Sequence, residues 1–542
     1  MGLKLSRTLK IITAAAFIMN LSACDTAGNN NKRDIVTFTS YMAINGVNID
    51  KDNDIQEYIA RKTGARCIET WKNPNQSAQD MIEDMIISQK YPDFIYGGVG
   101  QQQLLDANAL IPLNEYWDDY ENIKSYFTEK EWNRLKDDEG HIYYIPSYDN
   151  VYMEDTSPMH NEQAFWIQVK VLEWGGYPEI NTLDQYFDLI ERYLKENPIG
   201  ANGEPNIGYE ILTDGYMYFC LENPPQFLDG YPNDGSCIVD AENHIAVDYN
   251  ITDTAKRWFR KLNEEYKKGV VDPQFSFLTT EQYYEKIRSG NVLGMVDQYW
   301  SFSDAEDLLP PDSKYVPLDL VIDEGIVPHY RSARTLDVSQ GMGISVSCDD
   351  IERAMKFLDD LLSPEIHTLR FWGIEGEDYM VDEKGVFYRT ALQREMQDDE
   401  SYIKKHFCRY YAFPFYLGMN QDGINAYSPE NQPEEYFSTL GTPLMKCFEA
   451  YGVSTPAEMI NAVEENAPWY PMWSHTNRFT TDTDYGRAKA QMDDVKHRYL
   501  PKVVMSGDFE SAWKEYLEEY EKCDTRSYFN ELTAEIRRRA GS

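Results

Sequence analysis

Aromatic residues stand beside polar ones at several points of this sequence, in combinations that could hold a polar ring. Asp297 and Gln298 directly precede Tyr299 and Trp300 at the end of a segment with a strand-like pattern. An aromatic ring offers an apolar face for stacking, while carboxylate and amide groups bond hydroxyls. Sugars present both surfaces, because their C–H faces are apolar and their hydroxyls need planar polar partners. We therefore take this segment as the first candidate binding site.

Further aromatic residues occupy positions where a ligand could be reached. Tyr96 directly precedes a pair of glycines, Tyr41 follows the first predicted strand, and Trp469 and Trp473 enclose Tyr-Pro-Met. Each ring has an alternative role in packing, since large aromatic side chains are highly buried on average. The sequence leaves the two roles open at each position.

Polar candidates accompany these rings. Arg331 and Arg334 lie in a predicted loop and stand out in an acidic chain. They could pair in a bidentate way with an anionic sugar, and the alternative is a surface salt bridge. Asp149 and Asn150 follow a predicted strand, residues 140–146, that ends in proline.

Charge excludes one class of partner. The chain has 542 residues with 51 Lys+Arg against 91 Asp+Glu, a net charge of −40. Such a surface repels the phosphates of nucleic acids, so no nucleic acid is expected as a partner. It also repels anionic lipid headgroups, so any membrane attachment must be non-electrostatic. A hydrophobic content of 42% and a charged content of 26% are values of a globular protein.

Cysteine and histidine do not form a metal-binding pattern. The eight cysteines and eight histidines are dispersed, without CxxC or HExxH spacing. Residues 197–206 keep the Asn-Gly turn of a calcium-binding loop but lack its alternating Asp and Asn ligands. Residues 50–54 have alternating acidic residues, but Ile55 stands where such a loop needs a glycine. We therefore expect no cofactor and no calcium. Cys220 and Cys237 are near enough in sequence for one disulfide.

The N-terminus has the pattern of a processed export signal. A basic segment at 4–10 is followed by a short apolar segment at 11–19 and by Leu-Ser-Ala before Cys24. This order resembles a bacterial lipobox and predicts a signal peptide at 1–23 and a lipidated, flexible tether at 24–33. The alternative is an ordinary secretory signal with an incidental cysteine. A lipoprotein cysteine carries two acyl chains. One acyl chain gives only marginal membrane binding, whereas two anchor a protein stably.

The elements that must position the candidate residues alternate between strand and helix, which favours an α/β architecture. The glycine pair after Tyr96 would lie at the carboxyl edge of a sheet, where α/β folds bind ligands. The predicted elements are a strand at 35–38, a helix at 53–63, a strand at 65–70, a helix at 79–89 and a strand at 91–96.

Seven segments, taken together and in order, resemble the extracellular solute-binding proteins of ABC importers, family 1. They are PDFIYGG, LLDANALIPLNEYW, GHIYYIPSYD, the helix pair at 172–191, GNVLGMVDQYW, GMGISVSCDDIERAMKFLDDLLSPE and RFWGIEGEDY. The resemblance runs from about Asp34 to Tyr388. The sequence departs from the family where Gln168-Val169-Lys170 replaces the usual Arg-x-Asp.

The resemblance implies a periplasmic-binding-protein-like fold of type II, in which two α/β lobes are joined by crossover strands and enclose a ligand cleft. Lobe one would comprise 34–155 and 316–370. Lobe two, with a C-terminal segment covering the hinge, would comprise 156–315 and 371–542. Members of this family place an aromatic stacking residue where Trp300 stands, and the loop after the first strand, which holds Tyr41, commonly faces the cleft.

The implied function is capture of a carbohydrate, in particular an oligosaccharide, by hinge closure and its delivery to the permease of an ABC importer. The protein would be a monomer on the outer face of the cell membrane, held by its lipid alone. The candidate ligand-binding residues are Trp300, Tyr299, Asp297, Tyr96, Tyr41, Trp469, Trp473, Arg331 and Arg334.

The alternative is a secreted glycoside hydrolase that uses a pair of carboxylates. With 91 acidic residues, candidate pairs arise by chance and carry no weight. No GxSxG, P-loop or HExxH motif is present, and no catalytic residue is assigned. Ligand binding without product formation would separate the two functions.

Overall fold

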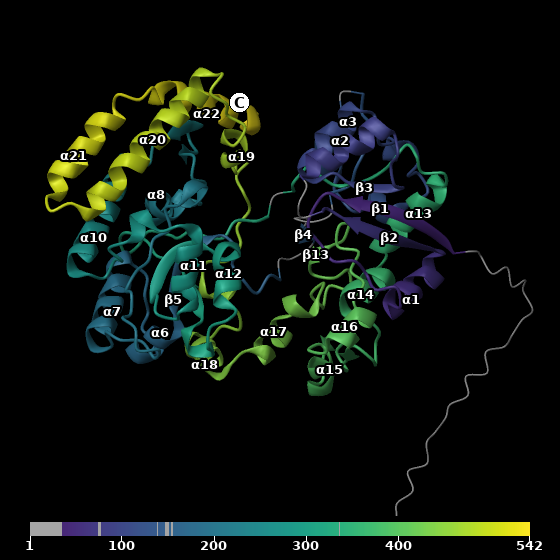
Figure 1. Ribbon diagram of the computed structural model, residues 1–542, viewed down its shortest axis with the longest axis horizontal. Helices are drawn as coiled ribbons and strands as arrows, with labels where there is room; N and C mark the ends of the chain where they lie inside the picture. Colours follow the sequence, from purple (N-terminus) through teal and green to yellow (C-terminus); the bar gives the residue numbers. More distant parts are fainter. Residues whose placement is uncertain are drawn as a thin grey trace, which may run out of the picture.

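The computed structural model describes residues 35–73, 77–137, 139–146, 151–152, 156–334 and 336–541. The predicted signal peptide and tether, Cys24, Asp149 and Asn150 lie outside these residues. The described chain forms two lobes side by side, each with its own sheet and helices (Figure 1). None of its helices has the length and apolar character needed to cross a membrane.

Lobe one is built on a four-stranded sheet in the order β10-β3-β1-β2. Strands β1 (Val36–Met42), β2 (Ala65–Trp71) and β3 (Phe94–Tyr96) are parallel, and β10 (Met342–Ile344) is antiparallel to β3. One face of the sheet packs into a core with α1 (Asp54–Thr63) and α13 (Ile351–Leu362). The other face packs against α2 (Ala78–Ser88) and α3 (Gln101–Asp106). Both faces of the sheet are therefore covered.

Local sequence explains where the first helix begins and ends. The side chain of Asn53 accepts a hydrogen bond from the backbone N–H of Gln56 at 2.8 Å, which caps α1. Gly64 ends the helix with a φ of 75°, a conformation that costs glycine little. Asp54 lies in the acidic first turn, as expected for the acidic run at 50–54.

Lobe two is built on a three-stranded antiparallel sheet in the order β8-β5-β9. Its strands are β5 (Gln163–Gln168), β8 (Gly294–Gln298) and β9 (Tyr315–Leu318). They pack with helices into a second core in which Trp166 and Trp258 are fully buried. The helices in that packing are α6 (Val169–Gly175), α7 (Leu183–Glu196), α10 (Asp253–Lys268), α11 (Thr280–Arg288) and α12 (Tyr299–Glu306).

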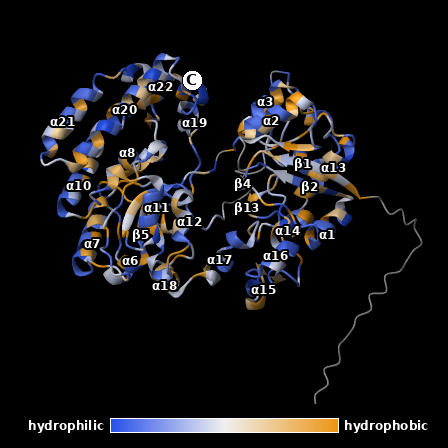
Figure 2. Ribbon diagram, viewed as in Figure 1, coloured by the Kyte–Doolittle hydropathy of each residue, from blue (hydrophilic) through white to orange (hydrophobic). Residues whose placement is uncertain are grey.

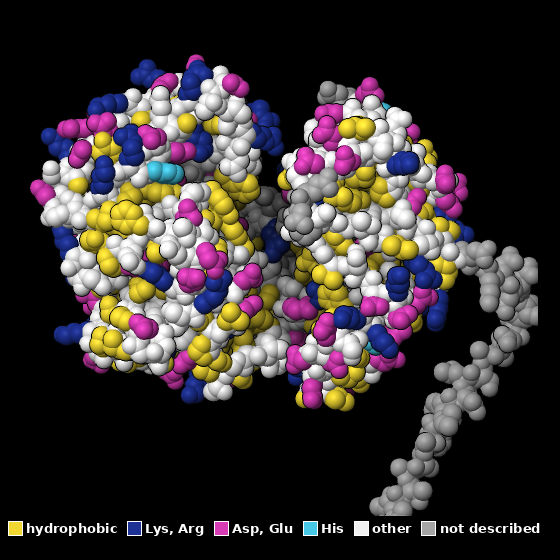
Figure 3. Space-filling view, viewed as in Figure 1, with side chains coloured by type: hydrophobic (Ala, Val, Ile, Leu, Met, Phe, Trp, Pro, Cys, Tyr) yellow, Lys and Arg dark blue, Asp and Glu magenta, His cyan; other side chains and the backbone are white. Residues whose placement is uncertain are grey.

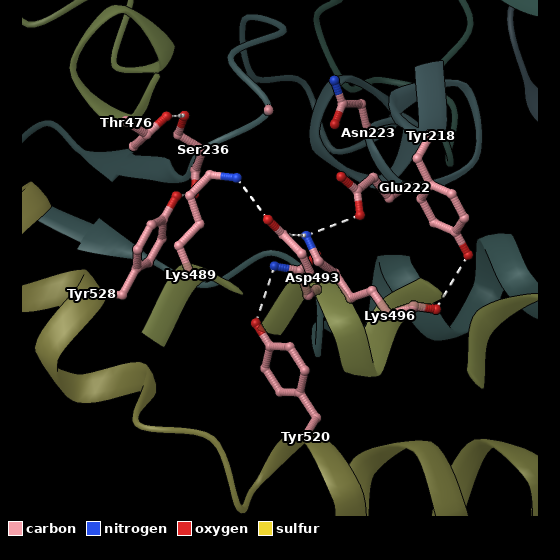
Figure 4. A network of polar contacts seen from close by, with 12 residues as sticks. Tyr218, Glu222, Asn223, Ser236, Thr476, Lys489, Asp493, Lys496, Tyr520 and Tyr528 are labelled. Carbon is pink, nitrogen blue, oxygen red and sulfur yellow. Dashed lines mark hydrogen bonds and ion pairs between the residues drawn. The ribbon is translucent and has the colours of Figure 1, made fainter. Parts of the chain in front are cut away.

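Three C-terminal helices cover the outer end of lobe two: α20 (Asp484–Met505), α21 (Phe509–Tyr520) and α22 (Thr525–Ala540) (Figure 1). Much of their ribbon has the blue of hydrophilic residues, as has that of α10, while orange, hydrophobic stretches of ribbon lie around the sheets (Figure 2). The Lys496 ammonium of α20 is nevertheless buried. It lies 2.9 Å from Glu222 of α8 (Phe219–Glu222) and 3.1 Å from Asp493 (Figure 4). This ion network fastens the C-terminal helices to the lobe.

Part of the chain that the sequence assigned to lobe two belongs to the core of lobe one. Cys408, Tyr410 and Phe413 are buried there with the lobe-one strands. The buried Arg370 of α14 (Pro364–Trp372) donates to the carbonyls of the 409–414 loop and so ties it to this core. Helices α15 (Ala391–Met396) and α16 (Glu400–His406) lie on the same side of the molecule (Figure 1).

The described chain passes between the lobes in three places. One passage joins β4 (Val151–Tyr152) to β5, and a second joins β9 to β10. The third runs from β13 (Leu417–Gly418), which pairs in parallel with β4, toward α17 (Pro433–Thr439) and α18 (Thr442–Tyr451). Residues 140–146, predicted as a strand, contribute a single bridge from Ile145 to Met342.

Candidate ligand-binding site between the lobes

The molecule is hollowed along the line where the two lobes meet (Figure 3). Strand direction places the binding edges of both sheets there. In lobe one, Tyr96 at the end of β3 pairs with Met342, where the second crossover enters β10. In lobe two, Gln298 at the end of β8 pairs with Gln163, where the first crossover enters β5. The carboxyl ends of β3 and β8 therefore both lie at the crossovers, at the base of the cleft.

Trp300 is one of the candidates with an exposed side chain. It lies in the first turn of α12 and is 49% exposed, and α12 is on the side of lobe two that faces lobe one (Figure 1). Its indole N–H donates to the side-chain oxygen of Gln298. The ring is thus held at one edge while about half of the residue stays exposed, which suits a stacking platform.

Asp297 lies beneath this turn and does not contact the cleft. Its side chain is fully buried and accepts hydrogen bonds from the Gln298 backbone N–H at 2.7 Å, from Tyr283 Oη at 2.9 Å and from Ser301 Oγ at 3.1 Å. Burial raises the pKa of this carboxyl to about 6. The expectation of a direct ligand contact is corrected here, because every oxygen of Asp297 is engaged inside the lobe. Asp297 instead positions the turn that carries Trp300.

Tyr299 points into the lobe. Its ring packs against Trp166, with centroids 5.6 Å apart, and against Phe302, while its hydroxyl donates to Glu306 at 3.1 Å. Burial raises the pKa of Tyr299 above its usual range. The tyrosine therefore anchors α12 from below and leaves the outer face to Trp300.

Tyr41 and Tyr96 are core residues and not platforms, which corrects a second expectation. Tyr96 is 1% exposed in the lobe-one core, and Tyr41 is 4% exposed in the smaller core on the other face of the sheet. The hydroxyl of Tyr41 contacts the sulfur of Met81 at 3.2 Å. β1 and β3 are parallel neighbours and end at the same edge of the sheet, but the side chains of Tyr41 and Tyr96 are covered there.

Trp469 and Trp473 lie on a segment of residues 457–473 that we call the strap. Trp473 is 45% exposed and begins α19 (Trp473–Thr476), which faces lobe one (Figure 1). Trp469 is half-buried, with its ring 5.3 Å from that of His244. Trp473 thus presents an open ring, while Trp469 is mainly packed against lobe two.

The strap is fixed to lobe two at its aromatic end. The Arg539 guanidinium of α22 donates to the carbonyl of Trp469 at 2.9 Å and to that of Pro471 at 2.8 Å. The backbone N–H of Met472 donates to the buried carboxylate of Asp234. These bonds hold the aromatic end of the strap against lobe two.

Arg331 and Arg334 belong to the hinge. Arg331 donates to the carbonyl of Ala457 at 3.3 Å, and its own carbonyl accepts from Glu464 N, so it joins the second crossover to the strap. Arg334 donates to Ser157 Oγ at 3.3 Å and so joins the second crossover to the first. The side chain of Arg331 has its partner on the strap and that of Arg334 on the first crossover, and a ligand would have to share them.

The structure contains a network of side-chain amides next to β8 that the sequence did not predict. The side-chain oxygen of Gln163 accepts from the amides of Asn223 at 3.2 Å and Asn233 at 3.1 Å. Gln163 and Asn223 are buried, whereas Asn233 is half-exposed beside the strap, where its carbonyl accepts from Tyr470 Oη. The Pro-Asn-Asp-Gly turn around Asn233 signals a loop, but nothing in the sequence pairs it with a strand 70 residues earlier.

Within the described residues, the cysteines form no disulfide and the acidic side chains form no metal-binding cluster. The described cysteines are free thiols, Cys220 and Cys237 among them, and Cys220 Sγ lies 3.5 Å from Asp297 Oδ1. In the described part of the chain, no three His, Cys, Asp or Glu side chains gather in a way that could hold a metal ion. In the loop at 197–206, the side-chain oxygen of Asn202 accepts from the amide of Asn291.

Comparison with known proteins places this geometry in a family context. No family model matches the chain. A fructooligosaccharide ABC transporter substrate-binding protein, FusA of Streptococcus pneumoniae, is 21% identical over 512 residues, which cover 88% of this chain and 85% of that protein.

Solved structures of similar shape cover nearly the whole chain. One is an HMO-binding, ABC-transporter-associated solute-binding protein from Bifidobacterium longum infantis, with a TM-score of 0.60 and 14% identity over 93% of this chain and 98% of that one. Another is an EF-hand mutant of S. pneumoniae FusA in complex with fructo-nystose, with a TM-score of 0.58 and 16% identity over 93% and 99%. These likenesses confirm the predicted periplasmic-binding-protein-like fold.

Proposed function

We propose that this solute-binding protein captures an oligosaccharide in the cleft between its lobes and delivers it to the permease of an ABC importer. The observation that carries the proposal is Trp300, an exposed ring held by its indole N–H at the cleft edge of lobe two. Similar proteins that are described as binding fructooligosaccharides and HMO support an oligosaccharide ligand. Stacking on an aromatic face suits a sugar ring and needs no catalytic group.

Within the cleft, we assign Trp300 and Trp473 as stacking platforms and Trp469 as the ring that supports the strap. Tyr299 supports Trp300 from below. Arg331 and Arg334 are the groups that a negatively charged sugar would engage at the hinge. Closure of the lobes would then cover the bound sugar, as in other hinge-bending receptors.

Cys24 would carry the lipid that holds the protein, as a monomer, on the outer face of the cell membrane. The support for this is the lipobox-like sequence before Cys24 and the relatives' descriptions as ABC transporter components. The tether at 24–33 would keep the acidic body away from the lipid surface. A Cys24→Ser variant would fail to incorporate labelled palmitate in the native host.

The enzymatic alternative has less support. The similar proteins reported above are substrate-binding components of transporters, not hydrolases. A glycoside hydrolase would release products from an oligosaccharide, whereas a receptor returns it unchanged.

The test is a thermal-shift panel on the chain from residue 25, with kestose, lacto-N-tetraose, a mannose pentasaccharide and an alginate trisaccharide. A sugar at 100 times its Kd stabilises the folded state by about 2.7 kcal/mol, which raises the Tm by a few degrees. Trp300→Ala should abolish the shift while leaving the Tm of the free protein nearly unchanged. A panel without any shift, or cleavage of a panel sugar detected by chromatography, would contradict the proposal.

A further inference from the structure

The contact between Trp300 and Gln298 fixes which way the glutamine amide is turned. The indole Nε1 of Trp300 can only donate a hydrogen bond, and it donates to the side chain of Gln298. The atom that accepts must therefore be the amide oxygen, although oxygen and nitrogen of an amide are otherwise hard to tell apart. The Gln298 nitrogen, with its two N–H groups, consequently occupies the other arm of the amide.

The rest of Gln298 is fixed as well. Its backbone N–H donates to the buried carboxylate of Asp297 at 2.7 Å, and its strand pairs with Gln163. That carboxylate is held in turn by Tyr283 and Ser301. The side chain therefore starts from a rigid point and is pinned again at its oxygen.

The nitrogen of this amide has no acceptor within the described part of the chain. Gln298 is half-exposed at the end of β8, beside the open ring of Trp300. A donor that is oriented in advance and still open to the cleft is suited to ligand recognition, because little side-chain freedom is lost on binding.

We propose that Gln298 is a specificity-determining residue that donates an N–H from its side-chain nitrogen to an oxygen of the sugar ring stacked on Trp300. This inference rests on the proposed function and adds the polar half of the same subsite. A sugar with an oxygen at that position satisfies the donor. An analogue that lacks this oxygen leaves it unpaired, which is how a hydrogen-bonding site rejects deoxy analogues.

The test separates the amide nitrogen from the amide oxygen. In Gln298→Glu, a carboxylate oxygen can still accept from Trp300, but no atom can donate to the sugar. Titration calorimetry with the four panel sugars should show a Kd raised about ten- to hundred-fold for each sugar that binds the wild type. The Tm of the ligand-free variant should stay within about 1 °C of wild type, since the contact to Trp300 is kept.

Gln102→Glu is the matched control, because it adds the same charge on the exposed face of α3 in lobe one. Its Kd should stay within twofold of wild type. A Gln298→Glu variant that binds as tightly as wild type, while Trp300→Ala does not bind, would overturn the role of Gln298 and leave the proposed function intact. If none of the four sugars binds the wild type, both proposals fall.

Discussion

Buried carboxyl groups are the residues through which pH should act on this protein. Glu69 of β2 is 8% exposed, and burial raises its pKa to about 8. Arg370 opposes this shift only in part, because its guanidinium is engaged by backbone carbonyls such as those of Leu361 and Pro414. Glu69 is therefore protonated in the folded protein at neutral pH and buried without its charge.

The direction in which pH changes the stability depends on whether the folded or the unfolded chain holds the proton of Glu69. Between pH 4.5 and about 8 the folded state keeps a proton on Glu69 that the unfolded chain releases. The free energy of unfolding should therefore fall as pH rises through this range, by at most about 1.4 kcal/mol per pH unit. Burial also raises the pKa values of three aspartates to about 6, namely Asp234, Asp297 and Asp319. Below pH 6 these groups should add to the decrease in the free energy of unfolding with rising pH.

Urea unfolding at pH 5, 6.5 and 8 checks this expectation. The wild type should be most stable at pH 5, and Glu69→Gln should flatten the fall between pH 6.5 and 8. Glu83→Gln, an exposed change on α2, should leave the slope as it is. Parallel slopes in wild type and Glu69→Gln would show that Glu69 is ionised in the folded protein.

Single residues of the candidate site differ in how well the sequence predicts their environment. The segment from Asp297 to Trp300 stands out in the sequence because polar residues and an aromatic pair succeed one another at the end of one strand. Tyr41 was misplaced because three successive residues at the end of β1 are buried, so the strand has no open face. Strands covered on both sides lack the alternation that tells core from surface.

At the scale of elements, the attachment of α20 depends on a buried charge. Lys496 is 5% exposed and lies between Glu222 and Asp493, while its carbonyl accepts from Tyr218. Removal of one member of a buried ion network leaves the others unpaired in a poorly solvated site. We expect Lys496→Met to lower the free energy of unfolding by about 3–5 kcal/mol.

Lys514→Met is the matched control for this change. Lys514 of α21 pairs with Glu518 on the surface, with its side chain 78% exposed. Such a pair contributes about 0–1 kcal/mol, so urea unfolding should hardly distinguish this variant from wild type. Equal losses in the two variants would mean that the network in Figure 4 does not fasten the C-terminal helices.

Element boundaries followed from local sequence, but the allocation of elements to lobes did not. The helix predicted at 53–63 is observed as Asp54–Thr63, because Asn53 and Gly64 cap it within the same stretch of chain. By contrast, residues 408–416 join lobe one through Arg370, some 40 residues away. Contacts of that range leave no periodic signal in a single sequence.

At the scale of the whole molecule, the three crossovers and the strap decide how the lobes can move. The strap pairs with the second crossover, where Ser332 bridges Glu464 and Ala333 N donates to the Glu464 carbonyl at 2.9 Å. That part of the crossover is therefore bound to lobe two. We therefore expect closure to bend the chain at residues 336–341 of this crossover and at the ends of the other two crossovers.

Closure over a sugar should make the molecule more compact. A compact chain of this length has a radius of gyration of about 24 Å, and two separated lobes exceed that value. Small-angle scattering of the chain from residue 35 should show the radius falling toward this limit when a panel sugar saturates the site. Trp300→Ala at the same sugar concentration should keep the radius of the free protein, because the ligand no longer bridges the lobes. An unchanged radius in a wild type shown by calorimetry to be saturated would mean that the sugar binds to one lobe without closing the hinge.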